Sequence, residues 1–195
     1  MSRFIETILV KNGRACNLAY HQRRVERTIR RFFGTRPFVL EANLLRLPEE
    51  GLFRCRLTYA QTIEKFELIP YSPTKKTKLL AIESDLNYNY KFHNRSDLEH
   101  LLKKAENRGC DDALIVKNGL VTDTTIANIA FFDGKRWITP ALPLLQGTAR
   151  ARLLQSGMII PGNITIDALE GFSHFALMNA LSGFYVGGPT ENIAR

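Results

Sequence analysis

Lys91 lies in the segment YKFHNRSDL (residues 90–98), which holds a lysine, a histidine, an asparagine and an arginine within five residues. A lysine amine can form a Schiff base with a carbonyl group when desolvation or nearby cations keep part of it neutral. His93 and Arg95 are close to Lys91 in the sequence and could contribute to such a site. An exposed lysine in a polar loop fits the same residues, so this segment alone leaves both readings open.

The chain is basic, with 27 Lys and Arg residues against 19 Asp and Glu residues and a formal net charge of +8. Many of the cations lie in HQRRVERTIRR (residues 21–31), where an arginine-rich helix face could bind phosphate groups. A solvated helix face is the alternative. The sequence has no nucleic-acid-binding motif and no interleaved exposed aromatics, so a nucleic-acid-binding module is the remote alternative.

Cysteine and histidine spacing argues against a metal site and a disulfide framework. The three cysteines (Cys16, Cys55 and Cys110) form no CxxC pair, and the four histidines form no HxH or HxxxH pair. No apolar run approaches the roughly 20 residues that span a bilayer, and the N-terminus lacks a signal-peptide pattern. We therefore expect a soluble cytoplasmic protein without a metal, and the absence of GxGxxG and P-loop patterns disfavours those nucleotide sites.

Hydrophobic periodicity predicts a mixture of strands and helices. In the first half, strands are expected over 3–11, 52–59, 62–69 and 78–86, and helices over 18–33 and 39–46. Turns are expected at the Asn-Gly pairs of residues 12–13 and 118–119, because both central residues of a type I′ turn need positive φ. The second half is expected to hold a helix from 96 to about 108, short strands over 113–139, a helix over 147–157, and a strand over 172–178.

Strands and helices do not alternate regularly as in βαβ units, which favours an α+β fold. Asn87 to Asn94 lacks a clear period and is interpreted as a linker. The predicted domains are an N-terminal α+β lobe over 1–86 and a C-terminal lobe over 87–195 that carries Lys91.

Three further stretches occur in a specific order: Lys-x-x-Asn-Arg at 91–95, DDALIVKNGLVTDTTIANIAFFDGKRWITP at 111–140, and LLQGTAR at 144–150. Together with FIETILVKNG (4–13) and the His-x-x-Arg of residues 21–24, this set resembles the class IV aminotransferase family. These are the fold type IV pyridoxal-phosphate enzymes, which include branched-chain and D-amino-acid aminotransferases and aminodeoxychorismate lyases. The KxxNR form and the ANIAFF segment look closest to the lyases.

The resemblance implies a two-lobed fold, with a small N-terminal α/β lobe and a larger, β-barrel-like C-terminal lobe, in a chain that is short for the family. It implies pyridoxal 5'-phosphate, an amino-acid-like substrate and a homodimer. The activity expected is that of a 4-amino-4-deoxychorismate lyase, a β-elimination that gives an aromatic amine and pyruvate. A branched-chain or D-amino-acid aminotransferase is the alternative, as is a catalytically weak cofactor-binding homologue.

The resemblance also assigns roles to individual residues. Lys91 would form the Schiff base with the cofactor and move the proton at the substrate Cα. Asp123 would pair with the protonated pyridine nitrogen, at a position where the family usually has glutamate, whose side chain is one methylene longer. Arg24 would bind the cofactor phosphate with its fixed fork of donors, although Arg23 and Arg27 could compete for that role.

Other residues would complete the phosphate site. Gly147 and Thr148 open a helix, and the N-terminus of a helix is a natural phosphate seat. Asn179 and Ala180, in MNALSG, match a late family segment that approaches the phosphate. Asn128 would support the wall of the site.

Substrate contacts follow less directly from the resemblance. The substrate-binding arginine of many members is not evident after the strand over 52–59. Arg54 and Arg56 share one strand face by alternation and could bind a substrate carboxylate if that face points inward. Tyr59 lies near the same point, and Glu6, in FIET, would line or brace the site.

Overall fold

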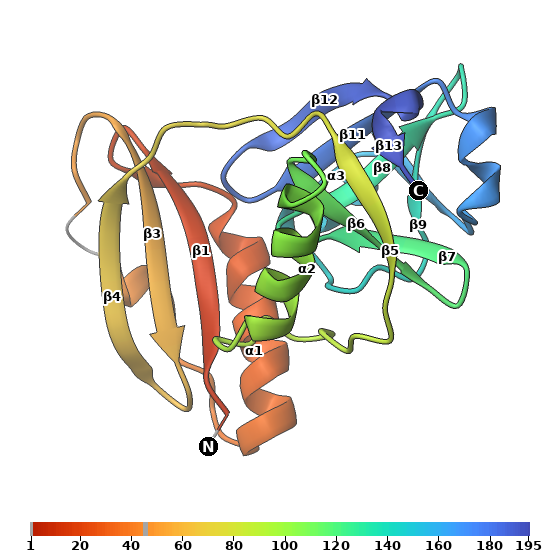
Figure 1. The fold of residues 1–195 in the computed structure, drawn as a ribbon. Coiled ribbons are helices and arrows are strands. Elements are labelled where there is room, and N and C mark those ends of the chain that lie inside the picture. Colours follow the sequence, from red (N-terminus) through yellow and green to blue (C-terminus); the bar gives the residue numbers. More distant parts are fainter. Residues whose placement is uncertain (1, 45–46) are drawn as a thin grey trace. The chain divides into compact units, whose positions relative to one another are not determined.

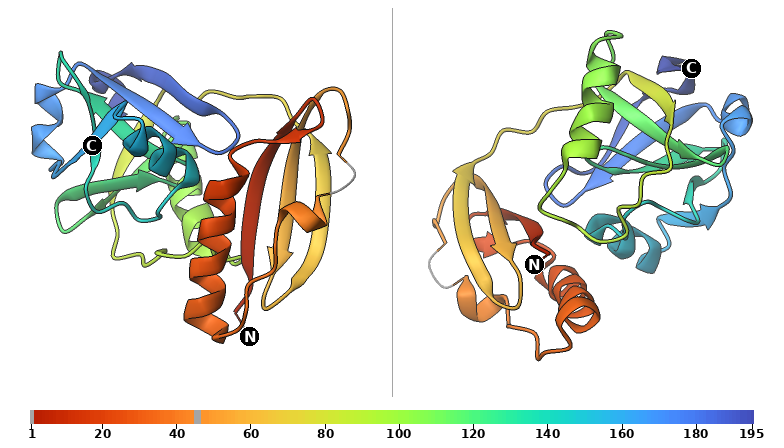
Figure 2. Two further views of the ribbon diagram at one scale, coloured as in Figure 1. Left: turned by 180° about the vertical axis from the view of Figure 1, so that it is seen from behind. Right: turned by 60° about the horizontal axis from the view of Figure 1, so that its bottom comes forward.

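The computed structural model describes residues 2–44 and 47–195, which form two compact units (Figures 1 and 2). The first unit comprises the chain up to Pro73 together with Tyr90–Asn94. The second comprises Thr74–Asn89 and Arg95–Arg195. Each unit has its own buried apolar cluster, and both combine helices with antiparallel strands, so the predicted α+β fold is confirmed.

The first unit is built on a four-stranded antiparallel sheet in the order β2-β1-β3-β4. Its strands are β1 (Phe4–Lys11), β2 (Arg14–Ala15), β3 (Leu52–Tyr59) and β4 (Ile63–Pro70). The turn from β1 to β2 has positive φ at Asn12 (47°) and Gly13 (76°). This confirms the Asn-Gly turn, which suits Asn and Gly because both tolerate the left-handed region.

Helix α1 (Leu18–Phe33) covers one face of this sheet, as the left view of Figure 2 shows. Val25 and Ile29 are fully buried in a cluster with residues of β1 and β3. The helix ends at Gly34, whose φ of 64° provides the left-handed cap, so the predicted bounds are confirmed. The helix predicted over 39–46 is a short 3-10 turn, η1 (Glu41–Asn43), and residues 45–46 lie outside the described part of the chain.

Strand alternation decides which side chains of the first unit meet α1. Phe4, Ile8 and Val10 of β1 are buried in the α1 cluster, and Glu6 shares their face. On β3, Cys55, Leu57 and Tyr59 join the same cluster. The residues between them, Arg54 and Arg56, therefore project from the opposite face of the sheet.

The second unit contains a nine-stranded sheet with the path β10-β9-β8-β7-β6-β5-β13, and β11 pairs with both β8 and β12. Its strands are β5 (Leu79–Glu83), β6 (Asp112–Lys117), β7 (Leu120–Thr124), β8 (Asn128–Phe132), β9 (Trp137–Pro140), β10 (Ile159–Gly162), β11 (His174–Asn179), β12 (Gly183–Pro189) and β13 (Ile193–Ala194). The turn between β6 and β7 has positive φ at Asn118 (50°) and Gly119 (73°), as predicted. Phe131, Phe175 and Leu177 are fully buried in the core between these strands.

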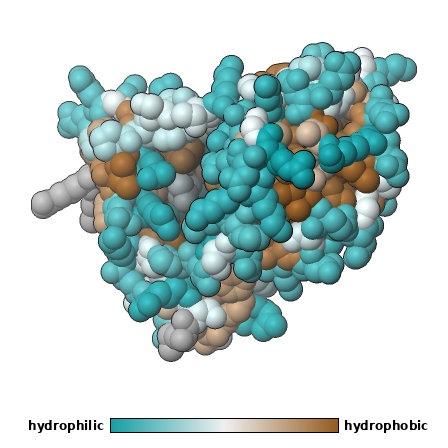
Figure 3. All heavy atoms as spheres, viewed as in Figure 1, coloured by the Kyte–Doolittle hydropathy of each residue, from teal (hydrophilic) through white to brown (hydrophobic). Residues whose placement is uncertain are grey.

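Two α-helices and two 3-10 turns complete the second unit: α2 (Ser96–Glu106), α3 (Thr148–Gln155), η2 (Asp167–Gly171) and η3 (Thr190–Asn192). Helix α2 packs on β6 and β5 through Leu98, Leu101 and Ala105. Its outward face is hydrophilic (Figure 3). Helix α3 packs on β10 and β11, where Ala149 and Leu153 contact Met178.

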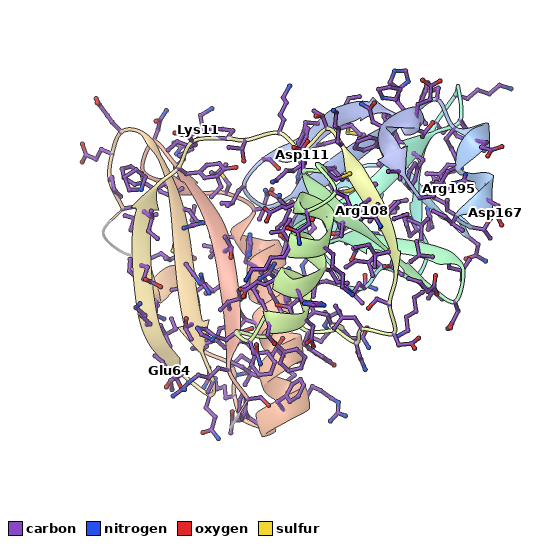
Figure 4. The ribbon with its side chains drawn as sticks, in the orientation of Figure 1. Lys11, Glu64, Arg108, Asp111, Asp167 and Arg195 are labelled. Carbon is purple, nitrogen blue, oxygen red and sulfur yellow. The ribbon has the colours of Figure 1, made fainter. Side chains whose placement is uncertain are left out.

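Polar contacts involve both ends of the second unit. The Asp111 carboxylate accepts hydrogen bonds from the backbone amides of Thr77 (2.7 Å) and Lys78 (2.9 Å), just before β5 begins. At the C-terminus, Arg195 lies 4.0 Å from Asp167 of η2 (Figure 4). It also lies 3.5 Å from Glu170 of the same turn. Within the described residues, no helix combines the length and apolar character needed to cross a bilayer.

The division of the chain differs from the predicted boundary near residue 86. Residues 74–89 lie with the second unit because β5 pairs in parallel with both β6 and β13. Residues 90–94, which include Lys91, lie with the first unit, because this segment hydrogen-bonds to β1. A boundary drawn from local sequence could not show that the chain returns to the first unit for five residues.

Candidate active site

A buried carboxylate lies at the centre of the first unit. Glu6 has no solvent exposure and accepts hydrogen bonds at both oxygens. Arg24 donates through Nε to Oε1 (2.7 Å) and through Nη2 to Oε2 (2.6 Å), while His21 Nδ1 lies 2.6 Å from Oε2. His21 and Arg24 are three residues apart on α1 and therefore point to the same side of the helix. The strand alternation of β1 and the helical spacing of α1 thus bring these three residues together.

The three residues carry well-defined charges. Burial alone would raise the pKa of Glu6, but the charge and hydrogen bonds of Arg24 and the hydrogen bond of His21 outweigh it and lower the pKa to about 2. Burial lowers the pKa of His21. The hydrogen bond and charge of Glu6 raise this pKa, whereas the positive charges of Arg24 and Lys91 lower it further. At neutral pH the cluster therefore holds an ionised Glu6 and a neutral His21.

Lys91 is attached to β1 beside this cluster. The Ile5 amide donates to the Lys91 carbonyl (2.9 Å), one residue from Glu6, and the His93 amide donates to the Arg3 carbonyl (2.8 Å). The ring of Phe92, the neighbour of Lys91, packs against that of Phe4 with a centroid distance of 5.1 Å. The charge of Lys91 is near enough to act on the pKa of His21. The lysine predicted from the sequence is thus placed with Arg24 in the same unit.

The three residues suggested for substrate contacts lie in two different places. Tyr59 is buried on the α1 side of β3, where its hydroxyl group hydrogen-bonds with Thr28, and burial raises its pKa. Thr28 in turn donates to the Arg24 carbonyl (2.9 Å). Arg54 and Arg56 project from the other face of the sheet, where Arg56 is opposite Glu67 of β4. The structure brings Tyr59 to the Glu6–Arg24 pair but does not bring the two arginines there.

A second buried carboxyl group lies in the second unit. Asp123 of β7 is directly opposite Asn128 of β8 in the strand register. Asn128 Nδ2 donates to Asp123 Oδ1 (2.7 Å) and to the Leu145 carbonyl (2.8 Å), while the Leu145 amide donates to Asp123 Oδ2 (2.8 Å). Asn128 therefore connects Asp123 to the segment that precedes α3.

Burial dominates the electrostatics of Asp123. It raises the pKa of this carboxyl group to about 7, although hydrogen bonds from Leu145 and Asn128 and the charge of Arg150 act in the opposite direction. Arg150 is itself buried and donates to the Pro140 carbonyl (2.8 Å). In the described part of the chain, no ion pair reaches Asp123. A cationic partner would therefore stabilise its ionised form.

The start of α3 is packed closely against Asn128. A Cβ atom at Gly147 would lie 1.9 Å from Asn128 Oδ1, so no residue larger than glycine fits without displacing that side chain. Gly147 is the N-cap of α3, and Thr148, which is buried, is its first residue. The first amides of a helix lack partners within the helix and attract anions. The tight packing at Gly147 holds this helix start next to the residue that orients Asp123.

Asn179 and Ala180 lie where β11 ends and turns into β12. The Asn179 side-chain oxygen accepts hydrogen bonds from the backbone amides of Leu181 and Ser182, both at 2.9 Å, and so shapes the turn. The preceding residue, Met178, pairs with Asn128 across the sheet and packs against Ala149 of α3. The turn therefore follows directly from the part of the sheet that holds Asn128 and α3.

The sequence profile named "Amino-transferase class IV" matches residues 3–186, which is almost the whole chain. The chain belongs to the class IV aminotransferase family. The fold agrees with that of other class IV aminotransferases of fold type IV, so the resemblance seen in the sequence is confirmed.

Individual relatives extend the match. An uncharacterized protein of Haemophilus influenzae is 34% identical over 189 residues, which cover 94% of this chain and all of that protein. A crystal structure from Haemophilus somnus, described as a "putative 4-amino-4-deoxychorismate lyase", is 35% identical and has a TM-score of 0.85, covering 94% of this chain and 98% of the other. A "hypothetical aminotransferase" of Mycobacterium tuberculosis, in its PLP-bound form, shares the fold with a TM-score of 0.79 at 18% identity, covering 95% of this chain and 80% of the other.

Class IV aminotransferases depend on pyridoxal phosphate, and the residues present fit its chemical groups. Lys91 offers an amine to an aldehyde. Asp123 is a buried carboxyl group that accepts hydrogen bonds from the Asn128 side chain and the Leu145 amide. It could also pair with a protonated ring nitrogen. The start of α3, where Gly147 packs closely against Asn128, offers backbone amides to a phosphate.

Two residues of these clusters were not foreseen from the sequence. His21 was noted only as part of the His-x-x-Arg motif, yet its spacing of three residues from Arg24 was a signal that both could reach the same carboxylate. Arg150 was noted only as the last residue of QGTAR, and no local signal indicated that it would be buried near Asp123. Glu6 and Asn128 were expected to brace the site, and that role stays a prediction; Glu6 is hydrogen-bonded to Arg24 and Asn128 to Asp123.

Proposed function

We propose that this chain is a pyridoxal-phosphate-dependent enzyme with 4-amino-4-deoxychorismate lyase-like activity, which converts its substrate to an aromatic amine and pyruvate. The observation that carries the proposal is the 35% identity, over 94% of this chain, to the Haemophilus somnus structure described as such a lyase. The KxxNR and ANIAFF segments support the same choice.

The chemistry would be divided between the cofactor and a few side chains of this protein. Pyridoxal phosphate, when bound, supplies an electron sink that stabilises negative charge on the substrate carbon next to the amine. Lys91 would hold the cofactor through its amine and would take the proton from that carbon. Asp123 would keep a proton on the ring nitrogen, and Asn128 and the Leu145 amide would orient its shorter side chain.

The cofactor phosphate would be bound by cationic and backbone donors. We assign this role to Arg24, to the start of α3 at Gly147 and Thr148, and to the turn at Asn179 and Ala180. Arg24 carries a planar guanidinium, whose fixed fork of N–H donors suits a phosphate. Glu6 would hold the guanidinium in place.

We assign no substrate contact to Arg54 or Arg56, because the sheet separates their face from Glu6 and Tyr59. Tyr59 is buried and hydrogen-bonds with Thr28, so it would support the Arg24 side of the site without contacting the substrate.

The cofactor is tested by visible absorption of the purified protein after incubation with pyridoxal phosphate. We expect an absorption band that borohydride removes, with the reduced cofactor attached to the peptide that contains Lys91. Lys91→Ala should show neither the band nor the adduct. Identical spectra and identical peptide masses for wild type and Lys91→Ala would exclude the proposal.

The reaction is tested by incubating the loaded protein with 4-amino-4-deoxychorismate, and separately with amino acids and a keto acid. A lyase releases aromatic amine and pyruvate in equal amounts from the first substrate. Release of a new keto acid from the second mixture alone would instead identify an aminotransferase. Cofactor binding without either product would identify a cofactor-binding homologue.

The family resemblance also supports a cytoplasmic homodimer, which we include in the proposal. Light scattering should then give twice the chain mass of 22.2 kDa. A mass of 22.2 kDa at working concentration would contradict the dimer but not the proposed activity.

A further inference from the structure

Asp112, the first residue of β6, is a buried carboxyl group in the second unit and has no solvent exposure. Its Oδ1 accepts hydrogen bonds from the Thr125 hydroxyl group (2.5 Å), the Thr125 amide (3.3 Å) and the Ala113 amide (2.8 Å), while Oδ2 has no hydrogen-bond partner among the described residues. Burial raises the pKa of Asp112, and the bond from the Thr125 hydroxyl group is the largest effect in the opposite direction. Because a carboxyl group is costly to bury without hydrogen bonds, Thr125 is its main stabilising partner.

Thr125 belongs to the turn between β7 and β8, two residues after Asp123. Two hydrogen bonds close this turn: the Thr124 amide donates to the Ala127 carbonyl (2.8 Å), and the Ala127 amide donates to the Thr124 hydroxyl group (3.2 Å). The bonds from Thr125 to Asp112 attach the turn to β6. Asp112 therefore limits the movement of the chain directly after Asp123.

The backbone of Thr125 makes a second contact, with Arg95. Arg95 Nη2 donates to the Thr125 carbonyl (2.8 Å), and the guanidinium carbon lies 5.8 Å from the centroid of the Tyr88 ring. Arg95 is the N-cap of α2 and lies four residues after Lys91, at the end of the Lys-x-x-Asn-Arg motif. Thr125 thus connects the buried carboxyl group to the start of α2, because its side chain bonds to Asp112 and its carbonyl group to Arg95.

We propose that Asp112 is a positioning residue for the two groups assigned to catalysis, Lys91 and Asp123. Through Thr125, it fixes the turn that follows Asp123 and the place in the second unit where the chain continues from the Lys91 segment (residues 90–94) into α2. The catalytic meaning of this arrangement rests on the proposed function, whereas the contacts from Asp112 through Thr125 to Arg95 are a property of the cofactor-free protein.

The positioning is tested first in the cofactor-free protein, by amide hydrogen exchange followed by NMR. Thr125→Val removes the hydroxyl group that bonds to Asp112 and keeps the shape of the side chain. Thr125→Ser is its matched control, because serine keeps a hydroxyl group. Asp112→Ala removes the carboxyl group, and Asp111→Ala is its control, because the neighbouring carboxylate bonds to the amides just before β5.

Two amides report on the two ends of these contacts, and a third is the reference. The Ala127 amide lies in the turn between β7 and β8, and the Glu99 amide donates to the Arg95 carbonyl (2.8 Å) in the first turn of α2. The reference is the Ala151 amide, which donates to the Gly147 carbonyl (2.9 Å) at the start of α3. Global destabilisation changes the exchange of all three amides, whereas loss of positioning changes only the first two.

We expect Thr125→Val and Asp112→Ala to speed the exchange of the two reporting amides by about tenfold relative to the reference, which is the effect of losing one hydrogen bond to a charged group. Both controls should keep the wild-type ratios. Unchanged ratios in folded Thr125→Val, or equal changes in Thr125→Ser, would overturn the proposal. Should neither informative variant fold, Arg95→Met decides, because Arg95 is only half-buried. It should speed the exchange of the Ala127 amide relative to the reference, and an unchanged ratio overturns the proposal.

Activity separates this inference from the proposed function. In an active enzyme, Thr125→Val should lower kcat by about tenfold to a hundredfold with a smaller change in KM, because small displacements of catalytic groups cost that much, and Thr125→Ser should restore kcat. A wild-type kcat in Thr125→Val would overturn the positioning role. Faster exchange in a protein without lyase or aminotransferase activity would support the contacts and reject the activity, and activity with unchanged exchange would do the reverse.

Discussion

Arg24 donates two hydrogen bonds, of 2.7 and 2.6 Å, to the two oxygens of Glu6 inside the first unit. Glu6 has no solvent exposure and Arg24 very little, so water replaces neither partner. The pair connects α1 to β1. Next to Glu6 on β1, the Ile5 amide donates a hydrogen bond to the Lys91 carbonyl. A change at either residue should therefore affect both the stability of this unit and the site that it carries.

Removing one partner of this pair should be strongly destabilising. Glu6→Gln leaves a buried guanidinium without its counter-charge, and the free energy of unfolding should fall by about 3–5 kcal/mol. Urea unfolding followed by circular dichroism measures this. Arg30→Ala is the control. Arg30 is exposed and forms a surface ion pair with Glu26 at 3.9 Å, and such pairs contribute at most about 1 kcal/mol. Equal losses in the two variants would contradict the role of the buried pair.

The same carboxylate predicts an acid-dependent loss of stability. The folded-state pKa of Glu6 is lowered from 4.5 to about 2. Its stabilising effect is therefore fully present above pH 4.5 and is lost as the pH falls towards 2. The difference in unfolding free energy between wild type and Glu6→Gln should shrink over this range. A difference that stays constant from pH 6 to pH 2.5 would show that Glu6 does not titrate as inferred.

Asp123 should give the opposite pH dependence in the cofactor-free protein. Burial raises its pKa from 3.8 to about 7, so the folded state binds the proton more tightly than the unfolded state. Its contribution is greatest below pH 3.8 and declines as the pH rises through 7. Asp123→Asn does not titrate, so its stability relative to wild type should increase between pH 4 and pH 8. The slope with pH is the readout, because the substitution also changes the hydrogen bonds and adds a constant offset.

The effects of substitutions at Gly147 and Asn128 on the free energy of unfolding should be strongly coupled. Gly147→Ala would place a Cβ atom 1.9 Å from Asn128 Oδ1 and force Asn128 away from Asp123 and Leu145. Asn128→Ala removes the same hydrogen bonds, and each single change should cost about 1–3 kcal/mol. Because the smaller side chain also removes the clash, the double variant should cost clearly less than the sum. Additive losses in thermal or urea unfolding would show that the two positions act separately.

Local sequence was sufficient for most of the secondary structure. Strands β1, β3 and β4 and helix α1 follow their predicted ranges, because alternation and helical spacing are set by neighbouring residues. The turns at 12–13 and 118–119 follow from the tolerance of Asn and Gly for positive φ. The family, too, was evident from the order of short motifs along the chain.

Contacts between residues far apart in the sequence decided which residues form the two buried clusters. The partners of Glu6 lie 15 and 18 residues away on a helix, and Leu145 lies 22 residues from Asp123, so strand register and helix placement bring them together. The same is true of Lys91, which joins the first unit through hydrogen bonds to β1, and of Arg54 and Arg56, whose face is decided by which side of the sheet α1 covers. The sequence by itself thus determined which residues could do chemistry. Tertiary structure alone decided which of them share a buried environment, because charge, burial and hydrogen bonding depend on neighbours that are distant along the chain.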